Sequence, residues 1–209
     1  STATISVLVR KSRKASELEA TDYVAAMLLA VSMMFLRFMI LILIFSREIF
    51  LSIYPYLLTM AVVAAIVAWF IHSRQKRPED QPAETEEDDS SNPLEFKVAL
   101  IFAVLFVIFT FLTHYTLVYA GTGGLNLLSF VSGFSDITPF ILNLLQNTGS
   151  VAALIITACS MQAIISNIMV NMFYALFFAG KGSKLRPWIL GGFGVVITCN
   201  LVLLLFFYI

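Results

Sequence analysis

The stretch Ser132-Gly133-Phe134-Ser135-Asp136-Ile137-Thr138-Pro139 interrupts a segment, residues 125–145, that otherwise has the composition of a membrane span. Asp136 lies deep inside this apolar run, where an ionised acid costs about 2.5 kcal/mol or more unless it is paired or solvated. The glycine, the three hydroxyls and the proline around it interrupt a helix rather than continue it. Broken helices at membrane depth are tolerated where they line a cavity or are covered by protein. The stretch therefore predicts transport or conduction, without naming the substrate.

The composition is that of an all-α polytopic membrane protein whose surroundings are the lipid bilayer. Of the 209 residues, 59% are hydrophobic and 12% charged, and the mean hydropathy is +0.90, whereas soluble domains are about one quarter charged. Several apolar runs reach the roughly 20 residues that cross a bilayer. The formal net charge is zero, so nucleic-acid binding has no electrostatic basis. Cys159 and Cys199 lie apart inside predicted spans, and we expect small buried residues there, with no cofactor.

The chain divides into four parts by composition. Residues 1–22 combine a short half-span with a basic connector, and residues 23–71 hold two transmembrane helices. Residues 72–92 form an acidic, proline-containing linker that we expect to be cytoplasmic. Residues 93–209 hold four further apolar segments, transmembrane helices 3–6. We therefore expect about six transmembrane helices, of which one, about 125–146, is discontinuous.

The positive-inside rule orients this arrangement. With six crossings, eight Lys and Arg residues fall on the side of residue 1 and four on the other. The count predicts that residue 1 and the 72–92 linker are cytoplasmic in a cell inner (plasma) membrane. The basic loop 181–186 then falls on the opposite side, against the rule. If the discontinuous helix is re-entrant and does not cross, that loop becomes cytoplasmic, which is the second topology.

An ungapped shift of 134 residues indicates an internal repeat. It places Ser1–Thr4 on Ser135–Thr138, Ser32 on Ser166, and Arg37 on Asn171. Few residues are identical, and what recurs is the order of features: a hydroxyl-rich break, a long span with a polar residue in its middle, a basic interface and a second span. Internal repeats that meet at discontinuous helices are a common transporter plan.

Arg37 and Asp136 are the two charges that the sequence leaves at membrane depth, because twelve of the 13 acids and twelve of the 13 bases lie in connectors or at span ends. In one interpretation they form a structural ion pair, and breaking such a pair would leave one bare charge. In the other, Asp136 binds a cation or proton and Arg37 is its tethered counter-ion. The two interpretations are compatible.

Neutral polar residues complete the candidate site. Asn167 and Asn171 lie on one helical face of the fifth span, together with Thr157, Ser160 and Tyr174. Two carboxamides on one face suit either ion binding or ordinary interhelical hydrogen bonding. Ser132 and Thr138 flank Asp136, and Thr138 is placed to cap a half-helix that starts at Pro139. In a broken helix, the free N–H groups of one half attract anions and the free carbonyls of the other half attract cations. The break therefore does not show which ion binds.

Several short motifs resemble one family. They are STAT at residues 1–4, MMFLR ending at Arg37, NPLE-F-K from Asn92, the SGFSD break and SN-x-x-V from Ser166. Together they resemble the membrane domain of unknown function 4010, found C-terminal to the MgtC/SapB domain. The resemblance implies a bacterial or archaeal inner-membrane protein that lacks here a preceding MgtC/SapB-like half. It implies only a loose association with transport and Mg²⁺, through the neighbouring domain.

This sequence departs from the family pattern at two positions. The family often has a second acid where this chain has Thr138, and a lysine where it has Asn171. A mechanism that needs two acids or two bases is therefore not expected here.

The sequence as a whole favours an ion transporter or channel, as a subunit or half, with a cation or proton preferred. Its ion-binding or coupling residues are Asp136, Arg37, Ser132, Thr138, Asn167 and Asn171. The alternative is a structural or regulatory membrane protein that binds a partner complex without transport, and a homo-oligomer stays open. No nucleophile–base pair or metal cluster is evident in the sequence, so we do not expect an enzyme.

Overall fold

The computed structural model describes residues 17–73, 94–146, 152–179 and 185–208, and these are helical apart from short connections. Over this part of the chain the expected all-α membrane architecture is confirmed, because five helices are long and apolar enough to cross a bilayer and one is short. The six helices are α2 (Glu17–Phe45), α3 (Arg47–Ser73), α4 (Leu94–Ser132), α5 (Ile137–Gln146), α6 (Ala153–Ala179) and α7 (Arg186–Tyr208). The linker assigned to residues 72–92 falls almost wholly outside the described residues.

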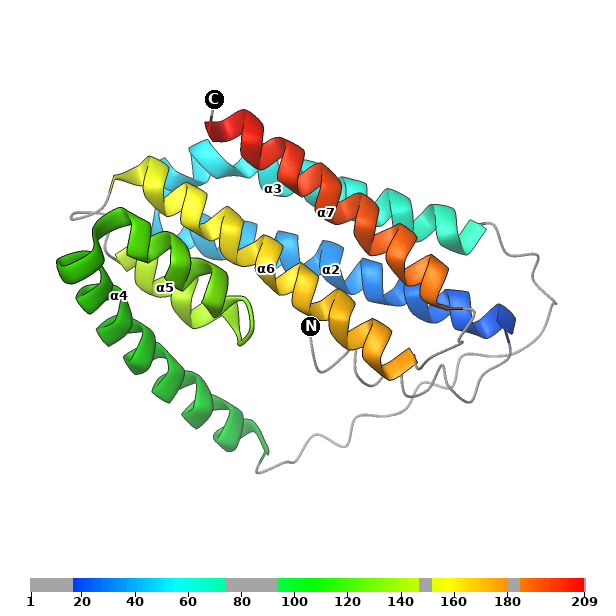
Figure 1. Ribbon diagram of the computed structural model, residues 1–209, viewed down its shortest axis with the longest axis horizontal. Helices are drawn as coiled ribbons and strands as arrows, with labels where there is room; N and C mark the ends of the chain where they lie inside the picture. The colour runs from blue at the N-terminus through cyan, green and yellow to red at the C-terminus, as the bar shows by residue number, and fades with distance from the viewer. Residues whose placement is uncertain (1–16, 74–93, 147–151, 180–184, 209) are drawn as a thin grey trace.

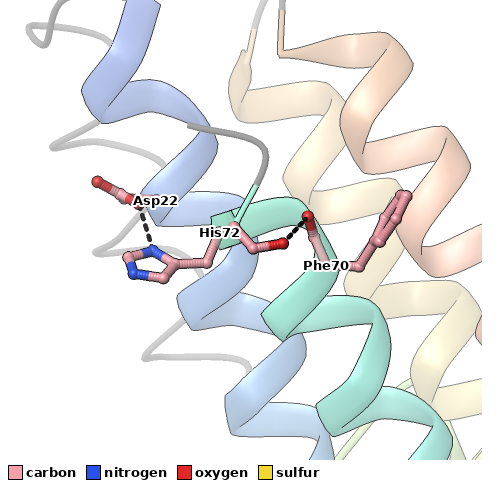
Figure 2. Close-up of polar contacts among 4 residues, drawn as sticks. Asp22, Phe70 and His72 are labelled. Carbon is pink, nitrogen blue, oxygen red and sulfur yellow. Dashed lines mark hydrogen bonds and ion pairs between the residues drawn. The ribbon is translucent and has the colours of Figure 1, made fainter. Parts of the chain in front are cut away.

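Helices α2 and α3 form a tight antiparallel pair. In its middle the Ser32 hydroxyl donates to the carbonyl oxygen of Ala61 at 2.8 Å. At one end Asp22 faces His72 across the pair, with 2.8 Å between Oδ1 and Nδ1 (Figure 2). Both of these side chains are half exposed, so solvent screens the contact and its contribution to stability is small.

Helix α7 packs on α3 in the opposite direction. The Tyr56 hydroxyl of α3 donates to the Asn200 side chain of α7, and Gly192 of α7 lies against Leu28 and Ile71. Gly192 has no side chain, so α7 comes close to the α2–α3 pair. The core of the described residues lies between these helices and continues along α5 and α6.

The segment after Gly121 folds back as a helical hairpin instead of running from one end of the bundle to the other. Gly121 has φ 58° and ψ −148°, and it divides α4 into a first part, residues 94–120, and a second part, residues 122–132. A positive φ favours glycine because it lacks a Cβ atom. Here the chain reverses direction (Figure 1), and within this helical segment Gly121 is the residue with non-helical dihedral angles.

Two sets of contacts define the hairpin, residues 122–146. Its outgoing helix runs parallel to α6, since Ser129 contacts Gln162 at 3.0 Å and Gly133 contacts Asn167 at 3.1 Å. Its return helix, α5, lies along the first part of α4, where the Asn143 amide donates to the Thr110 hydroxyl at 2.8 Å. Ten residues of α5 span about 15 Å, roughly half a hydrocarbon core. The hairpin therefore enters and leaves at the same end of the bundle, as in the second topology.

The helix bounds agree with the 134-residue shift. Adding 134 to residues 17–45 gives 151–179, which matches α6, and α3 falls on α7 in the same way. Because the hairpin does not cross, α2–α3 and α6–α7 run in opposite directions (Figure 1). The internal repeat stays a prediction, and this arrangement gives it an inverted form. The matching position Ser1–Thr4 lies outside the described residues.

Candidate functional site

The helix break lies at residues 133–136, at the tip of the hairpin. The second part of α4 ends in tight turns, in which the backbone N–H groups of Gly133, Phe134 and Ser135 each donate to a carbonyl three residues earlier. A Cβ atom at Gly133 would clash with the Ser166 side chain and lie 2.8 Å from the Asn167 backbone nitrogen. Glycine therefore lets the break lie directly against the middle of α6.

Asp136 begins the return helix. Its Oδ1 accepts hydrogen bonds from the Thr138 backbone N–H at 2.9 Å and the Thr138 hydroxyl at 2.7 Å. Asp136 is thus the N-cap of α5, and Pro139 occupies the third helical position, where a missing N–H costs little. The prediction that Thr138 caps a helix starting at Pro139 is wrong in this detail, because the helix starts two residues earlier, at Ile137, and Asp136 is the residue that precedes it.

Asn167 of α6 holds the other side of the break. Its amide nitrogen lies 3.1 Å from the carbonyl oxygen of Gly133 and 3.4 Å from that of Ser135. Its own oxygen accepts a hydrogen bond from the Asn171 amide at 3.1 Å. Backbone carbonyls that a broken helix would leave unpaired are thus satisfied by a side chain from a neighbouring helix.

A cavity of about 350 Å³ opens at this break, between α2, the hairpin tip and α6. Its apolar lining residues are Met34, Phe38, Phe134 and Ile137. Its polar lining residues are Arg37, Ser135, Asp136, Thr138, Asn167 and Tyr174. The cavity lies at membrane depth, because Asn167 is near the middle of the 27-residue α6.

Arg37 and Asp136 line the same cavity without forming an ion pair. The ion pair within 4.0 Å that joins described residues is Asp22–His72. Within the described part of the chain, Arg37 has no hydrogen bond either, and Asp136 bonds through Oδ1 to Thr138. Both side chains are exposed rather than covered by protein. The sequence prediction that these two charges meet in one place agrees with their shared cavity, whereas direct contact is not seen.

Two of the six expected site residues lie behind the cavity. Ser132 is buried and its hydroxyl donates to the Ser129 carbonyl oxygen at 2.7 Å within its own helix. Asn171 is fully buried and reaches the cavity only through Asn167. The structure therefore brings together Arg37, Asp136, Thr138 and Asn167 as lining residues, while Asn171 bonds to Asn167 and Ser132 bonds within its own helix.

A family model described as Domain of unknown function (DUF4010) matches residues 1–179, most of the chain. The chain belongs to this family. An uncharacterized protein of Aquifex aeolicus (strain VF5) is 27% identical over 115 residues, 54% of this chain and 50% of the relative. The match thus spans half of that relative's length. No solved structure matches the chain. The MgtC/SapB neighbourhood expected from the resemblance stays a prediction.

The apolar half of the cavity was not anticipated for this DUF4010 chain. Met34 and Phe38 are three residues before and one residue after Arg37, and these spacings place all three on adjacent positions of one helical face. The sequence thus contained a signal for the residues that accompany Arg37. Tyr174 was placed on the polar face of α6 but not among the site residues, and it lines the cavity.

Proposed function

We propose that this DUF4010 chain is the ion-translocating part of a membrane transporter or channel, and that the translocated ion binds at the tip of the hairpin. The observation that carries this proposal is the cavity of about 350 Å³ at the helix break, lined by both charges that the sequence places at membrane depth. A lone charge within a span is costly. Two such charges that face a shared polar cavity without pairing are positioned to interact with something that enters it.

The lining residues have distinct proposed roles. Asp136 either binds a metal cation or carries a proton. Its Oδ2 atom is available for this role, because it has no hydrogen bond within the described residues. Arg37 is the counter-ion that balances Asp136 when no cation is bound. The hydroxyl oxygen of Thr138 and the carboxamide of Asn167 are neutral groups beside the carboxylate, with Ser132 and Asn171 supporting them from behind.

The inverted relation of the two helix pairs supports this proposal. Transporters built from inverted repeats place their site near the bilayer midplane, beside discontinuous helices. In this chain the break packs against α6, and the cavity also contacts α2, the helix that the shift of 134 residues pairs with α6. The site therefore lies between the two helix pairs, where a rocking motion would change its exposure.

The hairpin also gives a more consistent orientation. Helices α2, α4 and α7 begin, and α3 and α6 end, at the same end of the bundle (Figure 1). Eleven of the 13 Lys and Arg residues belong to these helix ends or to the chain segments that adjoin them, whereas the opposite end has Arg47. We therefore place the first end in the cytoplasm of an inner membrane. The 181–186 loop is no longer an exception.

The alternative, a protein that binds a partner complex without transport, is less well supported. A continuous, packed contact between Arg37 and Asp136 without a cavity would favour it. The two side chains instead share a cavity and do not pair.

The proposal is tested with the Asp136→Asn variant in reconstituted vesicles. Asparagine caps helices about as well as aspartate, so the variant should fold while losing the charge. Fluxes of H⁺, Na⁺, K⁺ and Mg²⁺ are followed with ion-sensitive dyes, in media that contain chloride, a monocarboxylate or phosphate as the anion. We expect the wild-type chain to move at least one of these ions and Asp136→Asn to abolish that flux.

Asp22→Asn is the matched control, because Asp22 is a half-exposed carboxylate at the end of the bundle. It should leave the flux unchanged. Equal flux through wild type and Asp136→Asn would remove Asp136 from the mechanism. A wild-type chain that moves none of the four cations would count against the proposed cation transport.

A further inference from the structure

Hydrogen bonds within the described residues already satisfy four backbone carbonyl oxygens at the break, so side chains rather than backbone carbonyls remain for a ligand. The carbonyl oxygens of Val131 and Ser132 accept backbone hydrogen bonds, and those of Gly133 and Ser135 accept from Asn167. Broken helices offer such carbonyls to cations, but here each already has a protein donor.

Arg37 is a charged group of the cavity that has no partner among the described residues. A guanidinium has five N–H donors, no acceptor and a permanent charge, and within the described residues none of its donors is used. The planar fork of those donors matches the two oxygens of a carboxylate or phosphate group. The Arg37 guanidinium, which lies beside Met34 and Phe38, is therefore suited to bind an oxyanion.

The size of the cavity leads to the same kind of ligand. A proton or a bare metal ion occupies a small part of about 350 Å³, a volume near the lower end for pockets that hold small organic ligands. The lining is mixed, with Met34, Phe38, Phe134 and Ile137 facing the polar groups. An anion of several atoms fits this mixed lining, because its oxygen atoms can contact the polar residues and the rest of the molecule the apolar ones.

Charge balance couples such an anion to the cation at Asp136. Arg37 and Asp136 together are neutral, so a cation or proton on Asp136 leaves the Arg37 charge uncompensated at membrane depth. An anion on Arg37 restores neutrality, whereas the same anion beside an ionised Asp136 is repelled. Each ligand therefore raises the affinity for the other, and this coupling is reciprocal.

We propose that Arg37 binds a small oxyanion with one negative charge, a monocarboxylate or dihydrogen phosphate, which the chain moves together with one monovalent cation or proton at Asp136. The inference rests on the proposed function and extends it from ion transport to electroneutral symport. The lone carboxylate and lone guanidinium of the cavity are then the two halves of one coupled site.

Binding is measured on the purified chain in detergent, at mildly acidic pH where phosphate is mainly dihydrogen phosphate, by titration with sodium lactate, sodium phosphate or sodium chloride at constant ionic strength. We expect lactate or phosphate to raise the unfolding temperature saturably, and chloride not to. A response to lactate alone identifies the carboxylate class, and a response to phosphate alone the phosphate class. Arg37→Gln should weaken the binding at least about tenfold, since charged hydrogen bonds are lost, while Arg47→Gln, at the start of α3, should retain it.

Chemical modification keeps the test decisive if Arg37→Gln does not fold. Phenylglyoxal reacts with accessible arginines, and mass spectrometry of peptides reports Arg37 and Arg47 separately in the wild-type chain. The oxyanion that binds should protect Arg37 and leave Arg47 reactive. The proposal is overturned if neither oxyanion binds, if Arg37 is not protected, or if binding persists unchanged in Arg37→Gln.

Coupling is measured in vesicles with the radiolabelled form of the oxyanion that binds. An inward H⁺ or Na⁺ gradient should drive its uptake, while a valinomycin-imposed K⁺ potential alone should not. Uptake driven by the potential alone would overturn electroneutral symport. The two proposals fail separately: loss of cation flux in Asp136→Asn without Arg37-dependent anion binding supports the transport function and rejects the oxyanion.

Discussion

Asn167 donates a hydrogen bond of 3.1 Å to the carbonyl oxygen of Gly133, and so joins the middle of α6 to the tip of the hairpin. The two residues need each other. Gly133 allows the close approach because it has no side chain, and Asn167 satisfies the carbonyl that the helix break frees. Together they fix the position of Asp136, three residues further along the chain, at the wall of the cavity.

Replacement of Gly133 by alanine should destabilise the protein. The added Cβ atom would clash with Ser166 and approach the Asn167 backbone, and overpacking of this kind costs about 1–3 kcal/mol. Thermal unfolding in detergent measures the change. Gly191→Ala is the matched control, since no atom lies within 4 Å of its added Cβ, and it should be neutral or stabilising. Equal effects of the two variants would mean that the tip does not pack on α6.

Asn167→Leu should cost more stability than Asn171→Leu. The first change removes the donor to Gly133 and Ser135, and an orphaned buried polar group costs about 1–3 kcal/mol. The second change removes the Asn171 carboxamide, whose buried Oδ1 has no partner among the described residues. Removing an unsatisfied buried atom is favourable, and this gain offsets part of the stability lost with the rest of the carboxamide. Denaturant titration of both variants, side by side, gives the order, and the reverse order would contradict the proposed bracing role of Asn167.

Asp136→Ala and Asp136→Asn should separate capping from charge. Alanine removes the acceptor for the two Thr138 hydrogen bonds, and loss of an N-cap costs about 0.5–2 kcal/mol. Asparagine keeps an acceptor oxygen and should be nearly as stable as the wild type in the same unfolding assay. If asparagine were as damaging as alanine, the carboxylate charge rather than the cap would hold α5 in place.

Local chemistry predicted the break correctly. Gly133, the hydroxyls and Pro139 interrupt the helix whatever surrounds them, so the discontinuity follows from the sequence alone, as does the class of the protein. The cap was assigned to the wrong residue, because propensity favours both Asp136 and Thr138 and only the backbone path decides which side chain reaches the free N–H.

Whether the broken segment crosses was not decided by composition. Residues 125–146 are long and apolar enough for one span, and the reversal occurs at one residue, Gly121, whose φ and ψ are both non-helical. Contacts such as Ser129 with Gln162 then keep the outgoing helix on α6. Likewise, their charges alone predict that Arg37 and Asp136 lie in the same region. The distance between them depends on how α2 packs against the hairpin, and no local sequence pattern determines that packing.

The hairpin topology predicts which residues face the same side of the membrane. Gln146 is exposed at the end of α5, and Ser183 lies in the sequence between α6 and α7. After replacement of Cys159 and Cys199 by alanine, single cysteines are introduced as Gln146→Cys, Ser183→Cys and Ser90→Cys. A membrane-impermeant maleimide then labels right-side-out and inside-out vesicles.

We expect Ser183→Cys and Ser90→Cys to label from the cytoplasmic side and Gln146→Cys from the opposite side. Ser90→Cys is the internal reference, because both topologies place it in the same connection between α3 and α4. Six crossings would exchange the other two, with Gln146→Cys on the side of Ser90→Cys and Ser183→Cys opposite. The comparison is decisive because it depends only on whether 122–146 crosses, and not on which end of the bundle is cytoplasmic.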